Sequence, residues 1–170
     1  MNISPQGGPH ENVIAGKAIA FGEALKPEFK EYAAQVKKNA HHLAEKMKKH
    51  DFKLVADGTD THLILSDLSN KGISGKEAQN ALDSVGITLN RNTVPDDPRS
   101  PFDPSGIRLG TPAITTRGMK EAEMERIADW IDRVVSNISD EKVLMEVKNE
   151  VREMCLKFPL PGKRAEAILQ

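Results

Sequence analysis

The chain has 170 residues, a length that suits one domain, or one small domain with an extended helical arm. Its 24 basic and 25 acidic residues nearly balance, so its charge does not favour binding to nucleic acid or to a membrane surface. Aromatic residues make up only 4%, which argues against a surface for stacking bases. No apolar run approaches the roughly 18 residues of a membrane span. Because no signal peptide opens the sequence and Cys155 is its single cysteine, we expect a cytoplasmic protein.

Two helices are predicted within the first fifty residues. Pro9 suits the first position of a helix, and apolar residues lie on most sides of the segment 12–25. We therefore expect this helix to be buried or to pack against a partner. Pro27 begins the second helix, whose apolar residues recur every three or four positions as far as Met47, while lysines occupy the other face.

The middle of the chain predicts four short strands and one helix. Ser74 is a good N-cap for a helix from Gly75 to Val85, and Gly86 is suited to end it. The β-branched and aliphatic runs place the strands at residues 53–56, 62–67, 87–90 and 106–109.

Two more helices are predicted after the strands. The first runs from Thr116 to Asn137, and its expected buried stripe consists of Met119, Met124, Ile127, Ile131, Val134 and Ile138. The second begins at Ser139-Asp140-Glu141, with an acidic first turn, and ends before Phe158. It is expected to bury Val143, Leu144, Val147, Val151 and either Cys155 or Leu156.

This element order indicates an α+β fold with a small antiparallel sheet flanked by helices. We predict an N-terminal segment and helical arm at residues 1–50, an α+β domain at 51–158 and a tail at 159–170. Adjacent His41 and His42 do not face one another on a helix, so we expect no metal site there.

The segment 90–113 is the unusual part of the sequence. Prolines at positions 95, 98, 101 and 104 exclude a helix and favour a long, stiffened loop, which is commonly functional. It leads into Ile107-Arg108-Leu109, where an arginine stands between two aliphatic residues. A buried guanidinium requires a partner, so Arg108 is expected either to bind a ligand or to pair with an internal acid such as Asp103.

Several short motifs together resemble serine hydroxymethyltransferase, in that family's order and spacing across the whole chain. They are Gln6-Gly7-Gly8-Pro9, Thr59-Asp60-Thr61-His62-Leu63, Asn90-Arg91-Asn92-Thr93-Val94-Pro95, Ser100-Pro101-Phe102 and Ser105-Gly106-Ile107-Arg108-Leu109-Gly110-Thr111-Pro112-Ala113. The resemblance is to the C-terminal part of that enzyme only. It implies the small domain of a fold-type I, aspartate-aminotransferase-like enzyme that uses pyridoxal phosphate.

The function that the resemblance implies is reversible transfer of the serine hydroxymethyl group to tetrahydrofolate, giving glycine. The family's Thr-rich His-Lys segment, whose lysine forms the Schiff base with the cofactor, is not found in this sequence. We therefore expect the 170-residue chain alone to be catalytically inactive. As partners we expect a second copy of the chain in a homodimer, with no nucleic acid and no membrane.

The resemblance also assigns roles to individual residues. Arg108 is expected to bind the carboxylate of the amino-acid substrate, which its planar fork of donors matches. Gly7 and Gly8 are expected to contact the cofactor phosphate, Gly8 that of the neighbouring subunit. From the residues alone, a glycine pair of this kind is more often an ordinary turn.

Asn92, Ser100, Pro101 and Phe102 are expected by resemblance to form part of the tetrahydrofolate site. An asparagine offers a donor and an acceptor to a pteridine edge, and Phe102 offers a flat apolar wall. Without the resemblance these residues would be interpreted as ordering the loop. Two other interpretations stay open: a non-enzymatic, truncated module that folds and self-associates, and a folate-independent pyridoxal-phosphate enzyme of the same fold.

Overall fold

The computed structural model describes residues 7–160 and residue 162, and the chain forms two compact units, residues 1–34 and 35–170. The first unit contains α1 (Glu11–Ala24) and the opening turns of α2 (Pro27–Lys49), a helix that crosses the boundary between the units. The predicted division at residues 50 and 158 stays a prediction.

The first helix begins two residues later than predicted. The carbonyl of Pro9 accepts a hydrogen bond from the Glu11 N–H at 3.0 Å, and this tight turn places Pro9 ahead of the helix. None of the residues of α1 is buried, and the side chain of Phe21 is 68% exposed. Packing of α1 against a partner therefore stays a prediction. In the described part of the chain, no helix is both long and apolar enough to cross a bilayer.

The second unit contains a four-stranded antiparallel sheet in the order β1-β2-β4-β3. Its strands are β1 (Lys53–Leu54), β2 (Leu63–Asp67), β3 (Asn90–Asn92) and β4 (Gly106–Gly110). Two 3-10 turns, η1 (Val55–Asp57) and η2 (Ser69–Lys71), flank β2 along the chain. The small α+β fold with an antiparallel sheet is confirmed.

The third strand was predicted at the wrong residues. It spans 90–92 rather than 87–90, because the end of the preceding helix, α3 (Gly75–Ser84), holds the chain away from β4. Gly86 has a positive φ of 88°, and the Ile87 N–H donates to the Leu82 carbonyl at 2.9 Å. Pairing with β4 consequently begins only at Asn90. The predicted Ser74 cap is confirmed, with a reciprocal bond to Glu77.

The single helix predicted at 116–137 is two helices, α4 (Pro112–Thr116) and α5 (Glu121–Ser136). Gly118, with a φ of 96°, ends the first, and the Met119 N–H closes it by donating to the Ile114 carbonyl. Met119 is buried as predicted, although it lies outside α5.

The last helix, α6 (Glu141–Lys157), begins as predicted, because the Asp140 carboxylate accepts hydrogen bonds from the N–H groups of Lys142 and Val143. Near its end Cys155 packs against the core, whereas Leu156 is 73% exposed. The helix also buries Met154, which the pattern did not predict.

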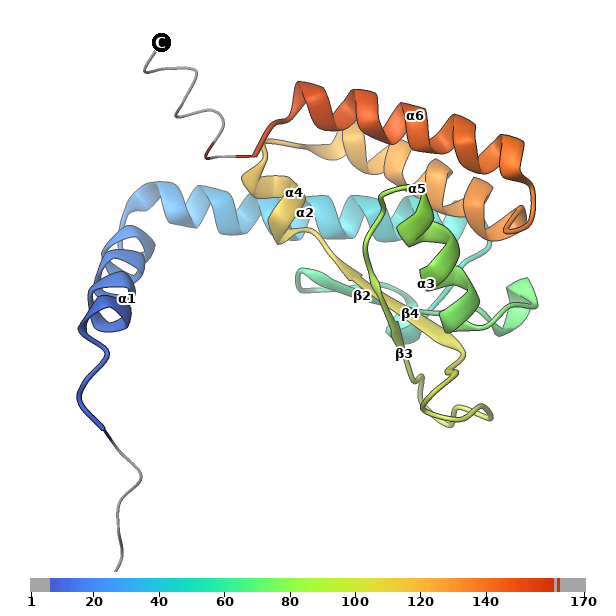
Figure 1. Cartoon of the computed structure of the whole chain (residues 1–170), viewed down its shortest axis with the longest axis horizontal. Helices are drawn as coiled ribbons and strands as arrows, with labels where there is room; N and C mark the ends of the chain where they lie inside the picture. Colours follow the sequence, from blue (N-terminus) through green and yellow to red (C-terminus); the bar gives the residue numbers. More distant parts are fainter. Residues whose placement is uncertain (1–6, 161, 163–170) are drawn as a thin grey trace, which may run out of the picture. The chain divides into compact units, whose positions relative to one another are not determined.

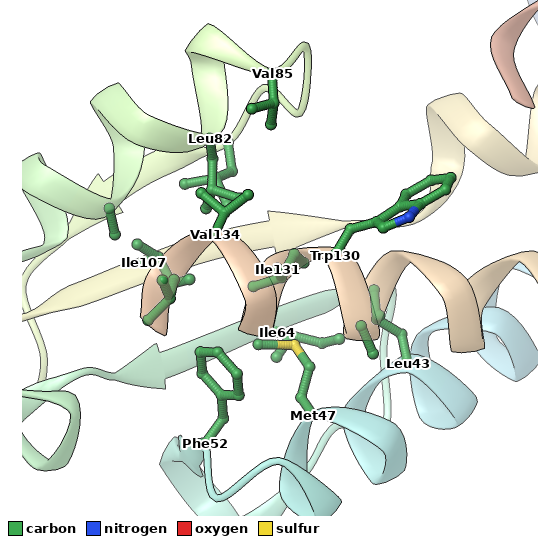
Figure 2. Close-up of a cluster of buried hydrophobic side chains, with 14 of the residues drawn as sticks. Leu43, Met47, Phe52, Ile64, Leu82, Val85, Ile107, Trp130, Ile131 and Val134 are labelled. Carbon is green, nitrogen blue, oxygen red and sulfur yellow. The ribbon is translucent and has the colours of Figure 1, made fainter. Parts of the chain in front are cut away.

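The core of the second unit lies between the sheet and its helices. In Figure 1, α3, α5 and α6 lie on one side of the sheet. Figure 2 shows apolar side chains from α2, α3, α5 and the strands meeting in one cluster. Ile64 of β2 and Ile107 of β4 are both fully buried in this cluster, so one face of the sheet is the core face. The opposite face is called the open face below.

Gly75 provides a test of how tightly α3 packs against the sheet. A Cβ at this position would lie 2.1 Å from the Gly106 carbonyl oxygen, so Gly75→Ala forces two backbones apart. Overpacking of this kind costs about 1–3 kcal/mol, which urea denaturation of the purified chain would measure. Lys76→Ala, at the next and exposed position of the same helix, is the control, with an expected change below about 0.5 kcal/mol. Equal stability of the two variants would contradict this packing.

Candidate functional site

Arg108 lies on the open face of the sheet because side chains alternate along β4. Ile107 is fully buried on the core face and Leu109 packs against the core, whereas Arg108 is exposed. In the strand register Arg108 is opposite Leu65 of β2 and Asn90 of β3. Directly opposed residues point to the same side of a sheet, so Leu65 and Asn90 flank Arg108 on the open face.

The guanidinium of Arg108 has no hydrogen-bond or ion-pair partner among the described residues. The internal pair with Asp103 does not form, since the Asp103 carboxylate lies 3.6 Å from the Nη1 of Arg99 instead. The side chain is exposed and points away from the core. All donors of the planar fork are therefore available to a ligand.

Glycines occupy the positions two residues before and after Arg108 on the same face. A Cβ at Gly106 would lie 2.6 Å from Val94 Cγ1 and 2.8 Å from the Asn92 carbonyl oxygen, so only glycine fits there. A Cβ at Gly110 would lie 3.1 Å from the His62 carbonyl oxygen. β4 therefore projects no side chain on either side of Arg108 along its open face.

The loop from β3 to β4 is organised by the carboxylate of Asp97. Its Oδ2 accepts hydrogen bonds from the N–H groups of Val94 at 3.2 Å and Ser105 at 2.9 Å. Its Oδ1 accepts from the Arg99 N–H at 2.9 Å and from Ser105 Oγ at 2.7 Å. The two ends of the loop are thus joined at a single side chain.

The loop is also tied to the segment between β2 and α3. The Leu68 N–H donates to the Ser105 carbonyl at 2.9 Å, and the Gly75 N–H donates to the Pro104 carbonyl at 2.7 Å. These bonds fix the chain just before it enters β4. The predicted stiff loop is therefore held by hydrogen bonds at its base as well as by prolines.

The same contacts set the protonation of Asp97. Partial desolvation opposes its ionisation, but the hydrogen bonds from Ser105, Arg99 and Val94 outweigh this and lower the pKa of the Asp97 carboxyl well below its usual range. A carboxylate with a lowered folded-state pKa stabilises the folded loop above the unfolded value, near pH 4. That contribution is lost as the pH falls below this value.

The residues expected to bind folate lie along the loop and at the end of β3. The side chain of Phe102 is 84% exposed, and Ser100 Oγ accepts a hydrogen bond from the Phe102 N–H at 3.3 Å. Asn92 is opposite Gly106 in the register, and its Nδ2 donates to the Thr93 carbonyl at 2.6 Å. Among the described residues no hydrogen bond joins Asn92 to Ser100 or to Phe102.

Gly7 and Gly8 belong to the first unit, so the site assembled above consists only of residues of the second unit. Both glycines are exposed and precede the N-terminus of α1. A Cβ at either position would meet no atom within 4 Å among the described residues, so packing does not require a glycine at either one. Glu11 places a negative charge in the first turn of the helix that follows.

An apolar cavity of about 140 Å³ lies on the core side of the sheet. Leu109 and Gly110 of β4 line it, together with residues of α5 and α6 such as Trp130 and Met154. Arg108 does not line it, because the arginine projects from the opposite face of the same strand. The cavity is therefore distinct from the candidate site.

Sequence reasoning did not single out Asp97 and Ser105. The sequence did contain a signal for Asp97, because it forms an Asp-Pro pair with the next residue. Such a pair commonly begins a turn, and its carboxylate bonds to nearby backbone N–H groups. Ser105 stands just before the strand that carries Arg108. The partner of Asp97 is eight positions away, a distance at which local turn rules do not operate.

Replacing Asp97 tests whether its carboxylate organises the loop. In Asp97→Asn an NH₂ group replaces one carboxylate oxygen, and this group cannot accept the hydrogen bonds that the loop N–H groups donate. We therefore expect faster amide hydrogen exchange at Val94 and Ser105. In the unchanged chain the protection of these amides should persist from pH 7 to 5 and fall below about pH 4, and the variant should lack this dependence.

Asp96→Asn is the matched control, because Asp96 is exposed and has a positive φ of 54° that asparagine tolerates. It should leave the exchange at Val94 and Ser105 unchanged. If Asp97→Asn also left that exchange unchanged, the loop would be held by its prolines alone.

Comparison with known protein families identifies the family of this chain. The family model described as serine hydroxymethyltransferase matches residues 2–131, from the N-terminal segment through most of α5. The matched range contains the whole sheet, the loop and Arg108, while α6 follows it. We conclude that the chain belongs to the serine hydroxymethyltransferase family.

Proposed function

We propose that this chain provides the substrate-carboxylate site of a glycine hydroxymethyltransferase. The reaction is reversible transfer of the serine hydroxymethyl group to tetrahydrofolate, which gives glycine. One observation carries the proposal: Arg108, within the range matched to the family, is exposed on the open face and has no partner among the described residues.

An arginine suits both substrates because serine and glycine share an α-carboxylate. The guanidinium presents parallel N–H donors that bond the two carboxylate oxygens together, and it stays charged at any working pH. Leu65 and Asn90 flank it in the register without a charge of their own. Neither neighbour competes for the guanidinium.

Pyridoxal phosphate, when bound, supplies the electron sink for this chemistry. The residues of this chain that fit the cofactor are Gly7 and Gly8, two exposed glycines whose lack of a side chain lets a phosphate approach the backbone closely. The described lysines do not fit a Schiff base. Only three of them are even half-buried, and each is held by an acid: Lys46 by Glu125, Lys48 by Asp57 and Lys71 by Asp132.

We therefore propose that the Schiff-base lysine comes from a different part of the enzyme and that residues 1–170 alone are inactive. In such an enzyme this chain is the small domain of a fold-type I, aspartate-aminotransferase-like protein. Arg108 holds the substrate by its carboxylate, which orients the rest of the amino acid toward the cofactor.

We assign part of the tetrahydrofolate site to Asn92, Ser100, Pro101 and Phe102. Phe102 supports this assignment, because an 84% exposed phenyl ring lies on a loop that Asp97 fixes at its base. A ring held in water on a fixed loop is available for stacking against a pteridine. Asn92 has a side-chain oxygen without a partner among the described residues.

We further propose that the protein acts as a homodimer in the cytoplasm. The exposed apolar residues of α1, including Val13, Ile19 and Phe21, support association with a second copy. The free thiol of Cys155 supports a reducing compartment.

The test of the carboxylate site is Arg108→Lys in an enzyme that joins this chain to a cofactor-binding domain. A lysine keeps the charge but loses the fork, so glycine and serine should bind about 10- to 100-fold more weakly, from a loss of about 1.5–3 kcal/mol. Arg152→Lys, at an exposed position on α6, is the control and should bind glycine normally. An unchanged affinity of the Arg108 variant for glycine would rule out this role.

The folate assignment is tested by comparing two reactions of the same enzyme. Phe102→Ala and Asn92→Ala should slow the tetrahydrofolate-dependent conversion of serine by roughly tenfold or more, the loss of one stacking or hydrogen-bonding contact. Folate-independent cleavage of bulky 3-hydroxy amino acids should change little, since it needs no pteridine beside the cofactor. Equal losses in both reactions would instead indicate that these residues order the loop.

A further inference from the structure

A buried polar network lies between α2 and the end of β4. Asn39 and Thr111 are fully buried, and Thr115 is only 8% exposed, in a unit whose other interior residues are mostly apolar. All three residues belong to the second unit. Burying polar groups is unfavourable unless each finds a partner, so their bonds require an explanation.

Asn39 joins α2 to α4 and to the segment that follows it. Its Nδ2 donates to Thr115 Oγ1 at 2.8 Å and to the Met119 carbonyl at 3.0 Å. Its Oδ1 accepts a hydrogen bond from Gln35 Nε2 at 2.9 Å. Both ends of the Asn39 amide are therefore satisfied, and its orientation is fixed.

Thr111 completes the network at the strand. Thr115 Oγ1 donates to the Thr111 carbonyl at 2.7 Å, and Thr111 Oγ1 donates to the Val36 carbonyl of α2 at 2.8 Å. The Thr111 N–H donates to the His62 carbonyl at 3.2 Å, which extends the pairing of β4 with β2 by one residue. Thr111 thus bonds to α2, to α4 and to the residue just before β2.

Thr111 directly follows β4, three positions after Arg108. The other end of β4 is fixed by the Ser105 bonds to Asp97 and Leu68 described above. The strand that carries the arginine is consequently held at both ends, by the loop at its start and by the polar network at its finish.

We propose that Asn39, Thr111 and Thr115 are positioning residues that fix the end of β4 and thereby the place of the Arg108 guanidinium. The proposal rests on the carboxylate role of Arg108 given above. Apolar residues of the same shape could hold two helices together as well as these do, so stability alone does not account for the network. Its directional bonds select one arrangement, and a displacement of about 1 Å in a binding group can cost 100-fold in rate.

The matched pair Thr111→Val and Thr111→Ser tests the proposal. Valine keeps the shape and removes the hydroxyl that donates to Val36, whereas serine keeps the hydroxyl. Val147→Ala, at a fully buried position of α6, is a control for general loss of stability. The melting temperature of every variant is measured, so that a general effect can be separated from a local one.

The first readout uses the 170-residue chain itself. Amide hydrogen exchange at Leu109, Gly110 and Thr111 should become about tenfold faster in Thr111→Val, as expected for one lost hydrogen bond. Thr111→Ser should retain protection, and Val147→Ala should lack a local effect at β4. If valine and serine variants show the same exchange, the anchoring role is overturned.

The second readout uses the enzyme assembled with a cofactor-binding domain. KM for glycine should rise roughly tenfold in Thr111→Val with a smaller change in kcat, and it should stay near the original value in Thr111→Ser and Val147→Ala. If Arg108→Lys weakens glycine binding but Thr111→Val does not, the positioning proposal alone fails. If Thr111→Val loosens β4 while Arg108→Lys leaves glycine binding unchanged, the anchor is supported and the carboxylate role fails.

Discussion

The structure of this domain depends on a sheet that, within the described residues, packs one face against helices to form the core. Ile64 and Ile107 are fully buried on the core face, and this burial fixes the register of β2 against β4. Because side chains alternate along a strand, the same register turns Arg108 to the open face. A slip of one residue would bury the guanidinium without a partner and expose Ile107, so the hydrophobic core and the candidate site are set by a single constraint.

Polar contacts hold β4, the strand that carries the arginine, at both of its ends. The Asp97 carboxylate accepts hydrogen bonds from both ends of the β3–β4 loop, including Ser105 just before the strand. Thr111, just after the strand, bonds to α2, to α4 and to His62 ahead of β2. Gly106 and Gly110 keep the face on either side of Arg108 free of side chains from its own strand. Together these features hold the strand at both ends and leave the Arg108 guanidinium on an accessible surface, within a chain of the serine hydroxymethyltransferase family.

Much of the fold could be predicted from local sequence signals. Helical periodicity with Pro27 located α2, and the Ser74 and Asp140 caps located the starts of α3 and α6. The errors arose where a contact distant in the sequence or a single glycine decided the structure. Strand β3 starts late because Gly86 and Ile87 remain tied to the end of α3, and Gly118 separates α4 from α5 within an apolar pattern that continues across the break.

The candidate site, like the fold, could be predicted only in part from the sequence. The type of residue at Arg108 and the family motifs around it were visible in the sequence, but its exposure and its lack of a partner depend on the sheet register. The role of Asn39 could not be predicted, because a polar residue within a helix gives no sign of partners that lie about 80 positions away. The most direct test of the central claim is a crystal structure, with glycine bound, of the enzyme assembled with its cofactor-binding domain. We predict two Arg108 nitrogens within about 3 Å of the glycine carboxylate oxygens. A glycine carboxylate bound by other groups, with Arg108 left in solvent, would contradict this account.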